Sequence, residues 1–166
     1  LLRLLYTLTM YLMTPVILYR LAARGLRYRR YLSRWKERFG FFPAPAMKNS
    51  SWVHAVSVGE VNAAVPLIEA LMLHYPDAPM VVTTVTPTGS ERVQKLFGDR
   101  VFHVYLPYDL PASVKRFLDR IRPRFAVIME TEIWPNLFIT CRERGIPIVV
   151  TNARLSERSV KGYGPV

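Results

Sequence analysis

The sequence predicts an α/β domain, with helices on both faces of a parallel β-sheet, preceded by a membrane-associated helix. Beyond residue 50, short apolar stretches alternate with stretches of helical character, at a spacing that implies right-handed crossovers between parallel strands. Each expected strand is apolar throughout, as strands covered on both faces are. An apolar N-terminus followed by many arginines predicts the membrane helix. We therefore expect a Rossmann-like fold, and 166 residues are enough for one domain with a core.

The N-terminal segment, residues 1–23, is expected to attach the protein to a membrane. Leu4–Tyr19 contains no charged residue. As a helix it would measure about 24 Å, less than the ~30 Å of a hydrocarbon core, so spanning and lying in the interface both remain open. Pro15 would kink this helix or start a new one. A soluble amphipathic helix is the alternative, which apolar residues on all faces disfavour. A secretory signal is excluded because the charges follow the apolar run.

The net charge of +11 is concentrated near the N-terminus, since residues 1–40 carry +8 and the remaining residues carry +3. This distribution argues against a nucleic-acid partner, which requires a basic face on the folded domain. A basic stretch beside an apolar segment is instead attracted to anionic cytoplasmic lipid, by about 1 kcal/mol per basic group. The one cysteine, Cys141, excludes an intrachain disulfide and is expected to be a small buried residue on a helix.

Residues 24–50 are expected to form a basic segment and linker, and residues 51–166 the sheet domain. The linker at Phe41–Ser51 contains two prolines, which prevent a helix. Helix ends carry local signals, with Gly98 and Gly145 at C-caps and Pro135 in a first turn. The expected strands are Trp52–Val58, Met80–Val85, Val101–Tyr105, Phe125–Met129 and Ile146–Thr151. The expected helices are Val61–His74, which would contain Pro66, Ser90–Phe97, Ala112–Ile121 and Pro135–Arg144.

Polar side chains follow the expected strands, and ligands of open α/β sheets bind at the carboxyl ends of the strands. Gly59 would end the first strand, and Glu60 follows it in a position to accept a proton from a substrate hydroxyl. The alternative for Glu60 is a cap on the next helix, where the dipole favours an acid. Glu130 directly follows the fourth strand, so it is expected to have a raised pKa or to be paired with Arg154 or His54.

Other polar residues at these strand ends have structural interpretations. The turn Thr86–Ser90 could bind a phosphate, but a helix N-cap formed by Thr88 or Ser90 is favoured. Glu132 is expected to lie near the N-terminus of the next helix. No Walker or Gly-x-Gly-x-x-Gly motif appears. His54 and His103 are expected in the core or a crevice wall, so we predict no metal site and no cofactor.

Five motifs together resemble those of the 3-deoxy-D-manno-octulosonic acid (Kdo) transferases, which are membrane-associated enzymes of lipopolysaccharide core assembly. The resemblance extends over essentially the whole chain, including the apolar N-terminus. The motifs are His54–Glu60, Thr84–Ser90, Val104–Asp109, Met129–Asn136 and Asn152–Ser156.

This resemblance implies the N-terminal half of a GT-B glycosyltransferase, located at the cytoplasmic face of the inner membrane. The N-terminal domain of the family binds the acceptor, a lipid A precursor, and the C-terminal domain binds the donor, CMP-Kdo. The implied reaction inverts the anomeric centre without a metal. Glu60 matches the catalytic base, and Glu130 matches the residue that stabilises the transition state. Substrate contacts are expected from Ser57, Gly59, Thr88, Asn152 and Arg154.

The donor-binding half of the family would lie beyond Val166, so we expect the 166-residue chain not to transfer Kdo alone. Leu1 in place of a start methionine suggests a fragment or a non-standard start codon. The competing hypothesis is a membrane-attached module that binds lipid without catalysis. A half that binds a nucleotide sugar is disfavoured, because no nucleotide fingerprint appears.

Overall fold

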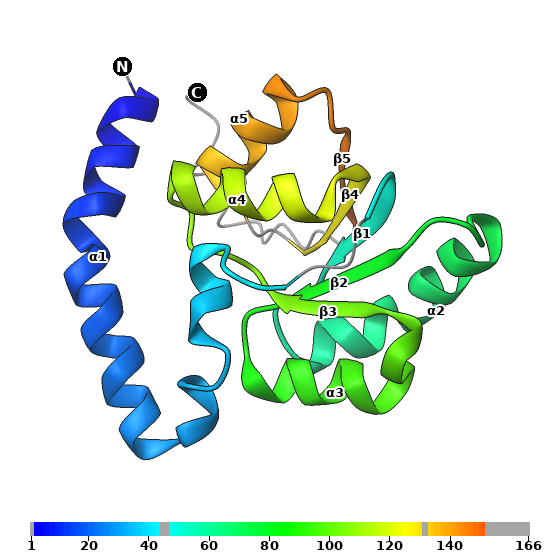
Figure 1. Ribbon diagram of the computed structural model, residues 1–166, viewed down its shortest axis with the longest axis horizontal. Helices are drawn as coiled ribbons and strands as arrows, with labels where there is room; N and C mark the ends of the chain where they lie inside the picture. Colours follow the sequence, from blue (N-terminus) through cyan, green and yellow to red (C-terminus); the bar gives the residue numbers. More distant parts are fainter. Residues whose placement is uncertain (1, 44–46, 131–132, 152–166) are drawn as a thin grey trace, which may run out of the picture.

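The protein contains a five-stranded parallel sheet in the order β3-β2-β1-β4-β5, as shown in Figure 1. The computed structural model describes residues 2–43, 47–130 and 133–151. The Rossmann-like parallel sheet, the flanking helices and the apolar N-terminal helix are all confirmed. The strands are β1 (Ser50–His54), β2 (Met80–Thr84), β3 (Phe102–Tyr105), β4 (Pro123–Met129) and β5 (Ile148–Thr151). The helices are α1 (Leu2–Arg27), α2 (Val58–His74), α3 (Pro87–Phe97), α4 (Pro111–Ile121) and α5 (Pro135–Glu143), with short 3-10 turns η1 (Arg29–Tyr31), η2 (Trp35–Phe39) and η3 (Gly98–Arg100).

Two hydrophobic clusters cover the two faces of the sheet. Trp52 points to the face covered by α4 and α5, where it meets Phe117 with ring centroids 5.1 Å apart. Val53, the next residue, points to the face covered by α2 and α3. Figure 1 shows the two helix pairs on opposite sides of the sheet. Alternate residues of each strand therefore enter different clusters, which is why the strands are apolar throughout. Cys141 is buried on α5, as expected.

The first strand is shorter than predicted, because β1 ends at His54 and α2 begins at Val58. The chain turns at Val56, whose carbonyl accepts the backbone N–H groups of Val85 and Thr86 at 3.1 and 3.3 Å. The prediction that Gly59 ends the strand is therefore wrong, since Gly59 lies in the first turn of α2. The other predicted strand ends agree with the structure to within two residues.

Helix α3 begins earlier than predicted, with Pro87 in its first turn. Its N-cap is Thr86, whose hydroxyl accepts the backbone N–H of Gly89 at 3.1 Å, so the prediction of a cap at Thr88 or Ser90 is wrong. Gly89 packs closely, since a Cβ there would lie 3.0 Å from Thr86 Oγ1 and 3.3 Å from the Val56 carbonyl. This close contact brings the start of α3 against the carboxyl end of β1.

Part of the predicted basic segment packs onto the sheet domain. Glu37, in η2, accepts the backbone N–H of Tyr105 at 3.0 Å, and Arg116 of α4 donates to the Phe39 carbonyl. Phe42 joins the cluster under α4. The division of the chain near residue 50 stays a prediction.

Helix α1 is 26 residues long and apolar enough to cross a membrane, by length and composition alone. Pro15 lies inside it. Its N-terminal part contacts α5, through an ion pair of Arg3 with Glu143 and a 3.0 Å hydrogen bond from the Thr7 hydroxyl to the Asn136 side chain. Many of its apolar side chains are exposed, including Leu2, Leu4, Leu5, Leu8, Tyr11, Leu12, Met13, Val16, Leu18, Tyr19 and Leu26.

Candidate active site

The sheet order places the candidate site between β1 and β4. The chain order of the strands reverses at this pair, and ligands of open α/β sheets bind at such a switch point, outside the carboxyl ends. Glu60 follows β1, and Glu130 follows β4. His54 is paired with Ile128, so extending the parallel register by two residues sets Glu130 beside Val56. The two predicted acids therefore share one edge of the sheet.

Glu60 is held in a fixed position at the start of α2, where its side chain is only 9% exposed. One carboxylate oxygen accepts the backbone N–H of Val56 at 2.8 Å, and the other accepts the Ser57 hydroxyl at 3.1 Å. These bonds satisfy polar groups at the helix N-terminus, so the capping role is observed. They do not exhaust the carboxylate, which has about four acceptor sites, so it can still accept a substrate proton.

Ser57 and Gly59 flank the Glu60 carboxylate. Ser57 is the N-cap of α2, and its hydroxyl is used to hold Glu60. Gly59 is exposed, and a Cβ built on it would meet nothing within 4 Å. The space over Gly59 is therefore open to a ligand. Substrate contact by either residue stays a prediction.

Glu130 has an unusual backbone conformation for a residue with a side chain, with φ at +60°. Its backbone N–H donates to the carbonyl of Thr151 at the end of β5, at 2.8 Å. A left-handed non-glycine residue costs on the order of 1–3 kcal/mol, and such strain concentrates at functional sites. Its side chain is half-buried. This conformation is independent support for the interest of the position.

The predicted partners of Glu130 have different outcomes. His54 is fully buried in the core, where its Nδ1 lies 2.8 Å from the Thr83 hydroxyl. Burial lowers the pKa of His54 to about 4, although a hydrogen bond with the Thr83 backbone acts in the opposite direction. His54 is therefore neutral at pH 7 and does not supply a positive charge to Glu130. The other predicted residues, Glu132, Asn152 and Arg154, lie outside the described residues.

The turn after β2 contains a residue that the sequence interpretation missed. Thr86 caps α3 and also donates its hydroxyl to the Val56 carbonyl at 3.3 Å. Thr88, which we expected to contact substrate, is exposed on α3, with its hydroxyl 3.4 Å from that of Thr86. The signal for Thr86 was available, because a threonine directly before proline is a common start of a helix.

Comparisons with known proteins identify the family. A family model described as 3-deoxy-D-manno-octulosonic-acid transferase (kdotransferase) matches residues 33–166. The chain belongs to the Kdo transferase family. It is 45% identical to a 3-deoxy-D-manno-octulosonic acid transferase of Haemophilus influenzae, over 99% of this chain and 39% of the relative.

Two further relatives agree with this assignment. The chain is 38% identical to a 3-deoxy-D-manno-octulosonic acid transferase of Bordetella pertussis, over 88% of this chain and 39% of the relative. It is 37% identical to a probable mitochondrial 3-deoxy-D-manno-octulosonic acid transferase of Arabidopsis thaliana, over 96% of this chain and 36% of the relative. The chain thus spans less than two fifths of the length of these Kdo transferases.

Asp109 is a second residue that the sequence interpretation of this Kdo transferase chain overlooked. Its buried carboxylate accepts the backbone N–H groups of Asn136 and Leu137 at 2.9 and 2.8 Å, which caps α5. Burial raises the pKa of Asp109, while hydrogen bonds, including that from Asn136, lower it. Asp109 thereby fixes the helix that follows the Glu130 loop. Its position in the Val104–Asp109 motif was the available signal.

His103 lies at the same carboxyl edge, on β3. Its Nε2 is 2.9 Å from the Thr84 hydroxyl, and its Nδ1 is 3.1 Å from the Arg34 guanidinium. Burial and the neighbouring Arg34 charge lower the pKa of His103 to about 3. A neutral imidazole beside an arginine is an acceptor, so His103 contributes to packing here. Among the described residues, no three His, Cys, Asp or Glu side chains group as a metal site would require.

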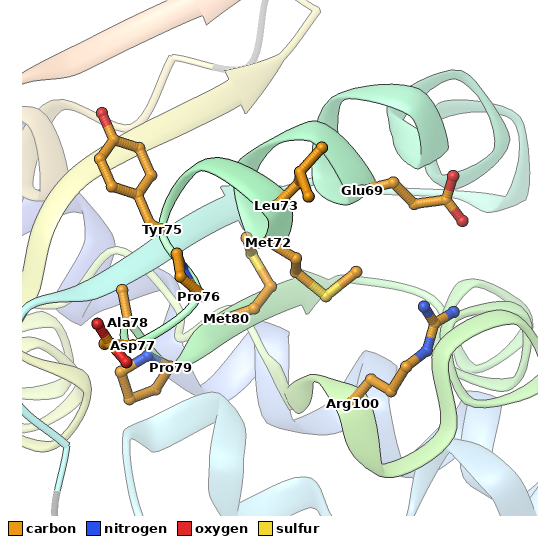
Figure 2. A pocket seen from close by; sticks show the side chains of 10 residues that line it. All are labelled: Glu69, Met72, Leu73, Tyr75, Pro76, Asp77, Ala78, Pro79, Met80 and Arg100. Carbon is orange, nitrogen blue, oxygen red and sulfur yellow. The ribbon is translucent and has the colours of Figure 1, made fainter.

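The largest hollow of the Kdo transferase chain lies away from these acids. It measures about 710 Å³ and is lined by residues at the end of α2 and the start of β2, with Arg100 opposite (Figure 2). Glu69 and Met72 form one wall, and Pro79 and Met80 another (Figure 2). This is the amino-terminal edge of β2, whereas ligands of such sheets bind at the carboxyl edge. We therefore assign it no catalytic role.

A smaller pocket of about 280 Å³ lies at the carboxyl edge, between α1 and the ends of β2 and β3. Arg20 and Arg24 of α1 line one side. Arg38, Thr86 and Tyr108 line the other. It is thus positively charged and shares Thr86 with the turn that contacts Val56.

Proposed function

We propose that the protein transfers Kdo from CMP-Kdo to a lipid A precursor, and that this chain is the acceptor-binding part. The observation that carries the proposal is the buried Glu60 carboxylate, fixed after β1 at the switch point that it shares with Glu130. Membership of the Kdo transferase family supplies the reaction class. The pair of acids at one strand edge is what general-base catalysis of glycosyl transfer requires.

Glu60 acts as the proton acceptor in this proposal. The acceptor hydroxyl gives its proton to the Glu60 carboxylate while its oxygen forms a bond to the anomeric carbon of Kdo. The bond from that carbon to the CMP phosphate oxygen breaks on the opposite side, so the configuration inverts. The bonds from Val56 and Ser57 keep the carboxylate in one rotamer, which removes the entropy cost of orienting it during reaction.

Glu130 stabilises the transition state in this proposal. Positive charge develops on the sugar ring as the bond to CMP breaks, and a fixed carboxylate nearby lowers the energy of that charge. The left-handed backbone at Glu130 directs the chain out of β4 and away from the sheet, toward the side where a substrate would lie. The folding cost of this conformation is accepted at a position where the side chain has a task.

Helix α1 attaches the protein to the cytoplasmic face of the inner membrane by lying in the interface. Its N-terminal part is bound to α5 through Arg3–Glu143 and Thr7–Asn136. If α1 crossed the bilayer in this arrangement, the charged surface of α5 would enter the hydrocarbon, at a cost of at least about 2.5–3.5 kcal/mol for each charged side chain. An interfacial helix keeps α5 in water and places the exposed apolar side chains of α1 in lipid.

The experiment that tests the proposal is Kdo transfer by the full-length protein from CMP-Kdo to lipid A precursor, with the product detected by mass. We expect transfer with inversion at the anomeric carbon, undiminished by EDTA, and no transfer by the 166-residue chain alone. Acceptor binding without any transfer by the full-length protein would instead identify a lipid-binding module and overturn the proposed function.

A further inference from the structure

The pocket beside α1 holds positive charge that is not neutralised by any described carboxylate. Within the described part of the chain, Arg20, Arg24 and Arg38 have no acidic oxygen within 4.0 Å, whereas the nearby Arg30 and Arg34 are paired with glutamates. Figure 1 shows α1 on the side of the sheet toward which β3 points, with η2 between them. Three unpaired arginines therefore converge where the carboxyl edge of the sheet meets α1.

Arg38 is the best evidence that the pocket receives an anion. It is only 3% exposed, and its guanidinium stacks on the Tyr105 ring at 4.3 Å and donates to the Val85 carbonyl at 2.8 Å. Its Nε has no hydrogen-bond partner among the described residues. Burying a charge with an unsatisfied donor is costly unless an opposite charge compensates. An anion bound in the pocket would supply that compensation.

A phosphate monoester fits the donors better than other anions do. Guanidinium groups bind phosphate through paired N–H groups, and the Thr86 and Tyr108 hydroxyls add further donors at the rim. The charges of Arg38 and Arg24 both act to lower the pKa of Tyr108, against the larger effect of burial, so their fields meet in the pocket. A volume of 280 Å³ is below the ~300–1,000 Å³ of sites for whole drug-sized ligands, so it suits a head group.

The position of the pocket indicates that the phosphate belongs to a lipid. Ile17 and Leu21 of α1 form its apolar wall. Leu12, Val16 and Tyr19 of the same helix are exposed. If α1 lies in the interface, the pocket opens at the level of lipid head groups. An anion attached to acyl chains can then enter from the membrane, without leaving it.

We propose that this pocket binds a phosphate monoester of the lipid acceptor and thereby positions the acceptor sugar toward Glu60. The inference rests on the proposed function. Two hydrogen bonds connect the pocket to the base, from the Thr86 hydroxyl to the Val56 carbonyl at 3.3 Å and from the Val56 N–H to Glu60 at 2.8 Å. The phosphate anchors the acceptor, and Glu60 acts on its hydroxyl.

The test compares Arg24→Gln with Arg27→Gln in the full-length protein. Both arginines are exposed on α1, and each stacks on a tyrosine, at 5.9 and 5.8 Å, but only Arg24 lines the pocket. The KM of Kdo transfer is measured for the phosphorylated acceptor and for the same acceptor without phosphate. We expect Arg24→Gln to raise the KM of the phosphorylated acceptor about tenfold with little change in kcat. Arg27→Gln is expected to match the unmodified protein, and the phosphate-free acceptor to show no difference.

Three outcomes would overturn the inference while leaving the proposed function intact. Equal effects of Arg24→Gln and Arg27→Gln would show a general surface charge. Equal effects on both acceptors would show that the phosphate is not what Arg24 binds. Selective loss of binding to phosphatidylglycerol vesicles by Arg24→Gln, with transfer kinetics unchanged, would assign the pocket to bulk phospholipid. Inorganic phosphate should compete with the acceptor in the unmodified protein and less so in Arg24→Gln.

Failure of the proposed function would look different, because the unmodified protein would then show no Kdo transfer to either acceptor. In that case the pocket is tested by direct binding of the phosphorylated acceptor to the unmodified protein and to Arg24→Gln. About tenfold weaker binding by the variant would support the pocket independently. Equal binding would reject it.

Discussion

Replacing Glu130 by glycine and by alanine separates backbone strain from catalysis. Both changes remove the same carboxylate, so lost side-chain contacts are matched. Alanine at φ +60° retains the left-handed penalty of about 1–2 kcal/mol, whereas glycine avoids it but loses about 0.5–1 kcal/mol of chain entropy. We therefore expect the glycine variant to unfold with a free energy about 1 kcal/mol higher than that of the alanine variant.

The assay is urea unfolding followed by the fluorescence of tryptophan, since Trp52 is fully buried in the core. The matched control is Glu69, which is exposed within α2. There the order should reverse, because alanine is favoured over glycine in a helix by about 1 kcal/mol. Both Glu130 variants should lose Kdo transfer to the same extent. An alanine variant as stable as the glycine variant would refute the left-handed backbone and the strain argument built on it.

Three further predictions follow from the structure. Gly59→Ala should stabilise the fold by about 0.5–1 kcal/mol, because its Cβ meets nothing, yet raise the acceptor KM if substrate passes over it; unchanged kinetics would remove Gly59 from the site. Stability should be complete above about pH 6.5 and fall as the pH drops toward 4, because His54 and His103 must charge on unfolding; His103→Gln should flatten this dependence, measured by urea unfolding. A cysteine at Leu2 should stay protected from membrane-impermeant reagents added on the periplasmic side; its labelling there would contradict an interfacial α1.

The sheet was predictable because its strands are buried on two faces. Trp52 and Val53 enter opposite clusters, so both must be apolar, and such runs stand out in the sequence. The end of β1 was not predictable from composition. Val56 and Val58 have high β-propensity, but the Val56 carbonyl is taken by the turn after β2, and that tertiary contact ends the strand.

The candidate acids were also found from the sequence, because a carboxylate directly after an apolar strand must lie at the carboxyl edge. The helix cap at Thr86 was missed since Thr86, Thr88 and Ser90 are locally similar, and the close approach of Gly89 to β1 decides among them. Arg38 could not be distinguished from its basic neighbours. Only the packing of η2 against β3 shows that it is buried rather than exposed toward lipid.

The central claim, that Glu60 is the proton acceptor, is tested most directly by the transfer rate of Glu60→Gln in the full-length protein. The glutamine oxygen can still accept the Val56 N–H, and its amide can donate to the Ser57 hydroxyl, so the start of α2 should be retained. We predict a loss of about 10²-fold or more in kcat, with acceptor binding preserved. Transfer at a near-normal rate by this variant would contradict the account and leave Glu60 as a helix cap alone.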